Sequence, residues 1–154
     1  MPSKRKEPWK MRGSPDRSRH LALARVLLVD DDPTSRLTLQ TVLQAGGYQV
    51  DAAASAAEAV GKMDEDQYEL VLSELQMESP EAGLKVLAHA KLMDYEPAAA
   101  LVTSSRSDVH CGSPVGAHML IEPEDVPELL TKVADLISQR ATRMVERGLR
   151  HAFA

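Results

Sequence analysis

The chain has 154 residues, which suits one domain of ordinary size with tails and leaves no room for two full cores. With 44% hydrophobic and 27% charged residues it is neither wholly disordered nor collagen-like, and 3% aromatic residues argue against binding single-stranded nucleic acid by base stacking. The single cysteine, Cys111, forms no intrachain disulfide, and we find no signal peptide or membrane-spanning run, so we expect a cytoplasmic protein.

The net charge of −5 hides an acidic body between two basic ends. Residues 1–25 carry eight Lys or Arg and two acids, residues 26–138 carry six and twenty, and residues 139–154 carry four and one. The corresponding net charges are +6, −14 and +3. Because residues 1–20 show no apolar periodicity, residues 1–24 are predicted to be a disordered basic tail, and residues 139–154 a basic helical extension of the body.

The first part of the body predicts two strand–helix units. A continuous apolar run at residues 26–29 is typical of a strand buried on both faces. Asp32 before Pro33 is typical of a helix N-cap followed by a first-turn proline, and this helix should stop at residues 46–47, which are both glycine. Residues 48–54 follow as a weaker strand, and Ser55 with Glu58 matches a capping box for a helix that runs to about residue 66.

The second part predicts three more strands. Residues 69–73 and 97–103 are apolar strands, separated by a helix whose apolar positions run from Leu84 to Leu92. Gly112 and Pro114 interrupt residues 104–116, so a helix there should be short or irregular. Residues 119–121 form a short fifth strand, and the last helix begins near residue 125 and keeps its apolar periodicity to Val145. This alternation indicates an α/β fold, a doubly wound parallel sheet of five strands with helices on both faces.

In such a sheet, ligands bind in the crevice outside the carboxyl ends of the strands. Chemistry-bearing residues directly follow four of the predicted strands. They are Asp30, Asp31 and Asp32 after the first, Glu74 after the third, Thr103 after the fourth and Glu122 after the fifth. Because parallel strands end at one edge, we expect an acidic pocket there. Its carboxylates would be Asp30, Asp31, Glu74 and Glu122.

Residues 25–138 resemble the receiver domain of response regulators, the family that takes part in phosphorelay, or two-component, signalling. The acidic pair after the first strand is Asp30-Asp31. Residues 68–77 (YELVLSELQM) are similar to the stretch that carries the family's phosphoacceptor aspartate, a position held here by Glu74. Thr103 matches the hydroxyl residue after the fourth strand. The resemblance implies a flavodoxin-like strand order, 2-1-3-4-5.

Three positions depart from the family pattern. Besides Glu74, Glu122 stands where the family has a lysine before proline, and of the two switch-equivalent positions, Thr103 and Met119, the second commonly holds an aromatic residue in the family. In the family a divalent cation and that lysine neutralise the charge that develops on the phosphoryl group. At an effective dielectric near 20, a pair of unit charges at ~4 Å is worth about 4 kcal/mol in either direction, so reversing one charge turns an attraction of that size into a repulsion of the same size. The longer Glu74 side chain also loses attack alignment, where an error of about 1 Å costs roughly a hundredfold.

These departures predict a stand-alone pseudo-receiver, with no catalytic residues, that acts by protein–protein contact independently of phosphorylation. Its expected partners are signalling proteins, such as a histidine kinase or a downstream effector. The resemblance implies contacts through the face made by residues 104–116, residues 119–121 and the last helix, and the same face would form a homodimer. Nucleic acid is not an expected partner, because no DNA-binding fold is recognisable.

The acidic pocket leaves two interpretations open. Crowded carboxylates repel one another, so either a divalent cation lies among them or some of their pKa values rise. In the first case Asp30, Asp31 and Glu74 would ligate Mg²⁺ or Ca²⁺, for which oxygen ligands are suitable, and Mg²⁺ is the candidate cofactor. In the second case the pocket is a solvated acidic rim without an ion.

Two further functions compete with this interpretation. Asp30 and Asp32 match the D-x-D-x-T motif of haloacid-dehalogenase-like phosphatases, in which the first aspartate is the nucleophile and the second the acid/base. Alternatively, the body is a scaffold whose basic tails bind anionic partners. The C-terminal tail offers a stripe of arginines at helical spacing, with Met144 and Val145 opposite as a seat for a partner helix. The stripe consists of Arg140, Arg143, Arg147 and Arg150.

Overall fold

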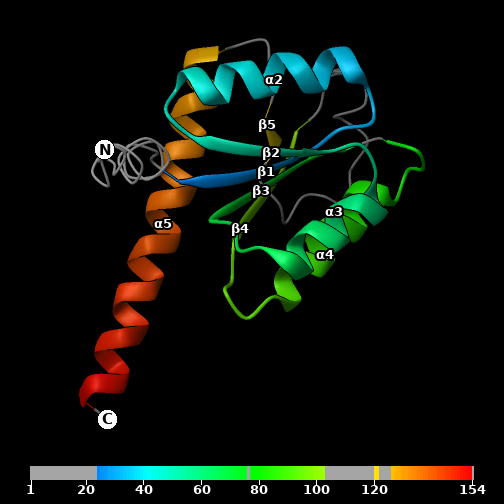
Figure 1. The fold of residues 1–154 in the computed structure, drawn as a ribbon. Coiled ribbons are helices and arrows are strands. Elements are labelled where there is room, and N and C mark those ends of the chain that lie inside the picture. Colours follow the sequence, from blue (N-terminus) through cyan, green and yellow to red (C-terminus); the bar gives the residue numbers. More distant parts are fainter. Residues whose placement is uncertain (1–23, 76, 103–119, 122–125, 154) are drawn as a thin grey trace, which may run out of the picture.

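The structure, a computed structural model, describes residues 24–75, 77–102, 120–121 and 126–153, apart from the side chains of residues 120, 121 and 153. The predicted short helix within residues 104–116 and the predicted start of the fifth strand at Met119 lie outside these ranges. The described residues contain the sheet and four helices (Figure 1).

The sheet has five parallel strands in the order β2-β1-β3-β4-β5, which confirms the predicted fold class and strand order. The strands are β1 (Arg25–Val29), β2 (Gln49–Ala53), β3 (Leu70–Glu74), β4 (Ala98–Val102) and β5 (Leu120–Ile121). β3 is buried along its whole length, and β1 is buried from its second residue. These two central strands therefore read as continuous apolar runs in the sequence.

Local signals in the sequence define where the helices begin. The helices are α2 (Pro33–Ala45), α3 (Ala56–Glu65), α4 (Ala82–Leu92) and α5 (Val126–Phe153). Asp32 is the N-cap of α2 and its carboxylate accepts a hydrogen bond from the Ser35 amide at 2.9 Å. Ser55 caps α3 by accepting from the Glu58 amide at 3.1 Å, as the capping-box pattern predicts. α2 ends at Gly46, and the following Gly47 has a φ of 103°, a conformation that only glycine adopts without strain.

Helices cover both faces of the sheet (Figure 1), and the two larger hydrophobic clusters lie on these opposite faces. Alternate residues of β1 point to opposite faces: Val26 and Leu28 belong to the first core, and Leu27 and Val29 to the second. α2 and α5 cover the first core. They contribute Leu39, Leu43, Leu129, Val133 and Leu136. α3 and α4 cover the second core. They contribute Ala59, Met63, Val86 and Ala90.

α5 is much longer than the sheet that it covers, and its C-terminal half extends past the sheet (Figure 1). Its buried residues end at Leu136, whereas Val145 and Leu149 are exposed. Arg140 fastens the helix to the loop before β4 by donating to the backbone oxygens of Tyr95 and Glu96, at 2.6 and 2.8 Å. Within the described ranges, no helix has the length and hydropathy needed to cross a membrane.

Candidate functional site at the carboxyl edge of the sheet

Asp30 is the first residue after β1 and is almost completely buried, at 1% exposed. Its amide donates to the Ala53 carbonyl at 3.0 Å, which holds the chain against β2. The carboxylate oxygen Oδ1 accepts a hydrogen bond from the Asp32 amide at 3.0 Å. The other oxygen, Oδ2, is buried and accepts no hydrogen bond from any residue that the structure describes. A buried carboxylate oxygen in this position calls for a cation or a water molecule.

Glu74 is the last residue of β3 and is also buried, at 6% exposed. β1 and β3 pair in parallel with Val29 opposite Ser73, so the next register position places Asp30 beside Glu74. The structure thus brings together two of the predicted pocket residues on neighbouring strands. Two carboxylates in a buried position repel unless a positive charge or a proton separates them.

The backbone at Glu74 is held from several sides. The Ser73 hydroxyl donates to the Glu74 carbonyl oxygen at 3.1 Å, and the Leu75 amide donates to Val102 of β4 at 2.8 Å. Gly83, in the first turn of α4, packs so closely that a Cβ built on it would lie 2.5 Å from the Glu74 carbonyl oxygen. Because α4 lies directly on this backbone, the chain cannot move back to offset a longer side chain at position 74.

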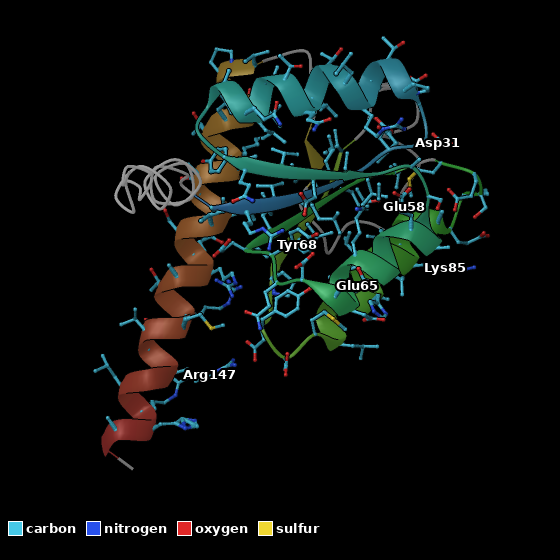
Figure 2. All side chains as sticks on the ribbon, in the orientation of Figure 1. Asp31, Glu58, Glu65, Tyr68, Lys85 and Arg147 are labelled. Atoms are coloured by element: carbon cyan, nitrogen blue, oxygen red, sulfur yellow. The ribbon has the colours of Figure 1, made fainter. Side chains whose placement is uncertain are left out.

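The loop from β1 to α2 contributes the remaining described residues of the edge. Asp31 is exposed (Figure 2), and Asp32 is occupied as the N-cap of α2. Arg36, one turn into α2, donates from Nη1 to the Asp30 carbonyl oxygen at 2.8 Å. The sequence analysis missed Arg36 and Gly83. An arginine one turn after an acidic N-cap, and a glycine inside an apolar helix pattern, are the signals that could have indicated them.

The other predicted site residues, Thr103, Met119 and Glu122, lie outside the described residues. Among the residues that are described, no three histidine, cysteine, aspartate or glutamate side chains form a metal-binding group, so Asp30, Asp31 and Glu74 are not gathered into a three-carboxylate cage. Mg²⁺ nevertheless needs only one or two carboxylates when water supplies its other ligands. The buried Asp30 Oδ2 fits that requirement.

The opposite, amino-terminal edge of the sheet carries paired charges. Arg25 donates to the Asp51 carboxylate at 2.9 Å and lies 5.0 Å from the centre of the Tyr68 ring. The Tyr68 hydroxyl donates to the same carboxylate at 2.7 Å, and the Arg25 amide donates to Glu69 at 2.7 Å. Burial, together with the hydrogen bond to Asp51, raises the pKa of the Tyr68 hydroxyl well above its usual value.

The strand order and the acidic carboxyl edge agree with the family that the sequence itself matches. The response regulator receiver domain matches residues 26–134 of the chain. The chain belongs to this family. The receiver fold is as the resemblance implied, and Glu74 is the last residue of β3. The phosphatase alternative does not fit this family, and its expected acid/base, Asp32, is engaged as a helix cap.

The receiver domain is similar to parts of larger bacterial regulators. It is 30% identical over 122 residues to the transcriptional regulatory protein PrrA of Mycobacterium tuberculosis and 29% identical over 127 residues to the transcriptional regulatory protein GlrR of Escherichia coli. A shorter match, 42% identical over 53 residues, joins it to a gliding motility regulatory protein of Myxococcus xanthus. The PrrA match covers 77% of this chain and 52% of PrrA, and the GlrR match covers 80% of this chain and 28% of GlrR. The gliding motility match covers 34% of this chain and 7% of that protein.

Solved receiver domains have the same fold. The response regulator TrrA of Thermotoga maritima, in complex with Mg²⁺-BeF, is 29% identical with a TM-score of 0.62, and the match covers 74% of this chain and 99% of TrrA. A receiver protein of Sinorhizobium medicae is 22% identical with a TM-score of 0.65, over 75% of this chain and 95% of its own. The chain is thus a receiver domain of two-component signalling. Receiver domains bind Mg²⁺ at the phosphorylation site, which corresponds here to the carboxyl edge.

Proposed function

We propose that this receiver domain signals through protein–protein contacts and takes up no phosphoryl group at residue 74. The observation that carries the proposal is the buried Glu74 at the end of β3, in the position where the family has its phosphoacceptor aspartate, on a backbone that α4 holds in place. A partner would then recognise the folded domain itself, and its occupancy would be set by the amount of either protein.

Side-chain length is the first reason. Phosphorylation of a receiver joins a carboxylate oxygen to phosphorus while the bond from phosphorus to the donor breaks, so the attacking oxygen must lie in line with the leaving group. Glutamate carries its oxygens about one bond further from the backbone than aspartate. Because Gly83 already lies against the Glu74 carbonyl, the main chain has no room to retreat by that length. Misplacement by about 1 Å costs roughly a hundredfold in rate.

Charge is the second reason. Buried Asp30 lies beside buried Glu74, and the family's lysine is replaced by Glu122, which adds a third carboxylate at the end of β5 in the sequence. Arg36 is a cation of this edge, and its hydrogen bond goes to the Asp30 carbonyl oxygen. An incoming phosphoryl group therefore meets a surplus of negative charge.

Mg²⁺ is the ion that this edge would hold. We infer that Asp30 is its principal protein ligand and that water supplies most of the remaining coordination, since Asp30, Asp31 and Glu74 are not gathered around one point. The buried, unsatisfied Asp30 Oδ2 supports this inference. The ion would supply positive charge to the edge. The alternative is a solvated acidic edge without an ion, and thermal unfolding with and without Mg²⁺ separates the two.

The expected partners follow from the family. We infer that a histidine kinase or a downstream effector binds this domain in the cytoplasm, through the face made by residues 104–116, residues 119–121 and α5. The same face is the proposed homodimer interface. Exposed Val145 and Leu149 on α5 support it, because exposed apolar side chains on a helix are suited to cover by a partner. Basic tails that bind anionic partners have less support, since Arg140 and Arg147 of the C-terminal stripe contact the domain's own loop.

The proposal is tested by restoring the family residues. The double variant Glu74→Asp with Glu122→Lys should form an acyl phosphate when incubated with Mg²⁺ and a small-molecule phosphodonor, and an intact mass spectrum would show the adduct. Each single variant serves as a control for one of the two reasons, length and charge. An inert double variant would show that these two positions do not account for the loss.

A further inference from the structure

A groove of about 550 Å³ lies at the amino-terminal edge of the domain, away from the phosphorylation site. It is formed where α3 and α4 end, together with the loop before β4. Four carboxylates line it. They belong to Asp64, Glu65, Asp66 and Asp94. Both helices direct their C-terminal ends here, and the negative ends of helix dipoles add to the charge of the carboxylates.

The groove also has an apolar component. Leu92, the last residue of α4, lines it and is 76% exposed, the largest exposure among the large hydrophobic side chains of the described residues. Met93 and Tyr95 lie next to it, and the Tyr95 hydroxyl donates to the Met63 carbonyl at the end of α3, which ties the two walls together. An acidic groove with an uncovered leucine suits an occupant that combines cations with a large apolar side chain.

The charges of the groove are only partly neutralised by the body. His89 pairs with Asp64 at 2.9 Å, and Arg25 lies 3.8 Å from Asp66. Glu65 and Asp94 form no ion pair with any residue of the described ranges. Figure 2 shows Glu65 at the end of α3, on the side of the domain that faces Arg147 of α5. Two of the four carboxylates of the groove therefore have no ion pair within the described residues, and one further cation, Arg140, donates to the carbonyl oxygen of Tyr95 in the groove lining.

We propose that the occupant is the basic segment formed by residues 1–23 of the same chain. This segment carries seven Lys or Arg against two acids, so its net charge of +5 complements the groove. It also contains Trp9, the only tryptophan of the protein, which matches the exposed Leu92. The chemistry of this interaction is independent of residue 74, so the proposal goes beyond the signalling function.

The position of the segment supports the same occupant. The described chain begins at Ala24, and the next residue, Arg25, already contacts Asp66 in the groove wall. The segment is therefore joined to the body beside the groove. Twenty-three residues reach up to about 76 Å when extended, far more than the groove requires. Because the segment is tethered there, its effective concentration at the groove is on the order of millimolar.

Trp9 makes the proposal measurable in the full chain. Its fluorescence emission and anisotropy report on this segment alone, since no other tryptophan contributes. At low ionic strength we expect blue-shifted emission and raised anisotropy, because Trp9 is covered by the groove. At about 1 M salt, where the Debye length falls to about 3 Å, both signals should revert to those of a solvated tryptophan. A solvated Trp9 signal at every salt concentration would overturn the proposal.

Charge reversal in the groove identifies the docking site. The variant Glu65→Lys with Asp94→Lys should give, at low salt, the emission and anisotropy that the wild type shows at high salt. Neither residue pairs with a described residue, so the fold is expected to persist. Glu81→Lys with Glu146→Lys changes the net charge equally at exposed positions outside the groove and should leave the signal unchanged. An unchanged signal in the groove variant would overturn the proposal.

Two further measurements distinguish docking within the chain from a misfolded groove and from docking onto a second copy. The groove variant should keep the wild-type midpoint of urea denaturation, which a misfolded groove would not allow. The wild-type signal should not change on dilution, because the segment and its groove belong to one chain. A docked signal that disappears on dilution would mean that the segment occupies the groove of a second copy, and it would overturn docking within the chain.

Discussion

The charges beside the central strands are arranged in opposite ways at the two edges of the sheet. At the carboxyl edge, Asp30 and Glu74 are buried side by side, and the Arg36 hydrogen bond reaches only the backbone. At the amino-terminal edge, Arg25, Asp51 and Tyr68 share one network in which the carboxylate accepts from both neighbours. Charges that stabilise a fold are paired when they are buried, whereas same-sign charges collected at one edge mark a site for an ion or a ligand.

At the carboxyl edge, the backbone packing and the side chains differ in how far they follow the family pattern. The packing that defines the family's edge is retained, since β1 and β3 end together and α4 lies against the end of β3. The chemistry of that edge has changed through side chains, at residue 74 and, in the sequence, at residues 119 and 122. Under the proposed function, such a receiver preserves its shape for partners without phosphotransfer.

The largest expected effect concerns the packing of α4 on the carboxyl edge. Gly83→Ala would place a Cβ 2.5 Å from the Glu74 carbonyl oxygen and 2.9 Å from that of Leu75, so the backbone must shift. We expect a loss of about 3 kcal/mol in the free energy of unfolding, the upper range for overpacking, measured by urea denaturation. Gly61→Ala is the matched control, because its Cβ would meet nothing within 4 Å and should stabilise α3 by about 0.5–1 kcal/mol. Equal effects of the two substitutions would contradict the close contact.

The next effect tests the ion at the carboxyl edge. If Mg²⁺ binds Asp30, it should raise the free energy of unfolding by about 1.4 kcal/mol at roughly ten times its dissociation constant. Asp30→Asn should abolish this increase, because the amide cannot replace the buried carboxylate oxygen. Thermal unfolding with and without Mg²⁺ measures both. If the wild type does not respond to Mg²⁺, the edge is the solvated acidic rim.

A smaller effect is expected at the amino-terminal edge. Tyr68→Phe removes one hydrogen bond to Asp51, while Arg25 still pairs with that carboxylate, so we expect a loss of about 1 kcal/mol. The effect has a pH signature. Since the pKa of Tyr68 is raised in the folded state, the unfolded chain releases this proton first, and stability should fall as the pH rises above 10.0.

The phenylalanine side chain of this variant cannot ionise, so the variant should lose less stability at alkaline pH than the wild type. The remaining fall comes from Tyr48 and Tyr95, whose pKa values burial also raises. Urea denaturation below and above pH 10.0 gives the two slopes. Identical slopes for the variant and the wild type would show that Tyr68 does not keep its proton in the folded state.

Much of the fold was predictable because it depends on local signals. Apolar runs marked the central strands, and the caps at Asp32 and Ser55 marked where α2 and α3 begin. Contacts between distant residues were not predictable from spacing. Arg140 donates to the Glu96 carbonyl, 44 residues away, and Arg147 pairs with the Glu96 side chain. Two of the four arginines that the sequence offered to a partner therefore contact the domain itself. No periodicity in the sequence encodes that contact.

The candidate site was predictable where it depends on strand order and not where it depends on packing. Parallel strands must end at one edge, which brought Asp30 and Glu74 together without knowledge of their contacts. The close approach of Gly83 to the Glu74 carbonyl oxygen depends on how tightly α4 packs, which no sequence pattern specifies. Arg36 was missed because its hydrogen bond goes to a carbonyl, and a carbonyl is present at every residue.

The most direct test of the account is the intact mass of the wild-type protein after incubation with Mg²⁺ and a small-molecule phosphodonor, with any adduct mapped to a residue. We expect no adduct, because under the proposed function the longer side chain of Glu74 is misplaced for attack and the family's lysine is a glutamate in the sequence. A phosphoryl group mapped to Glu74 would contradict it and would restore phosphotransfer as the function of this domain.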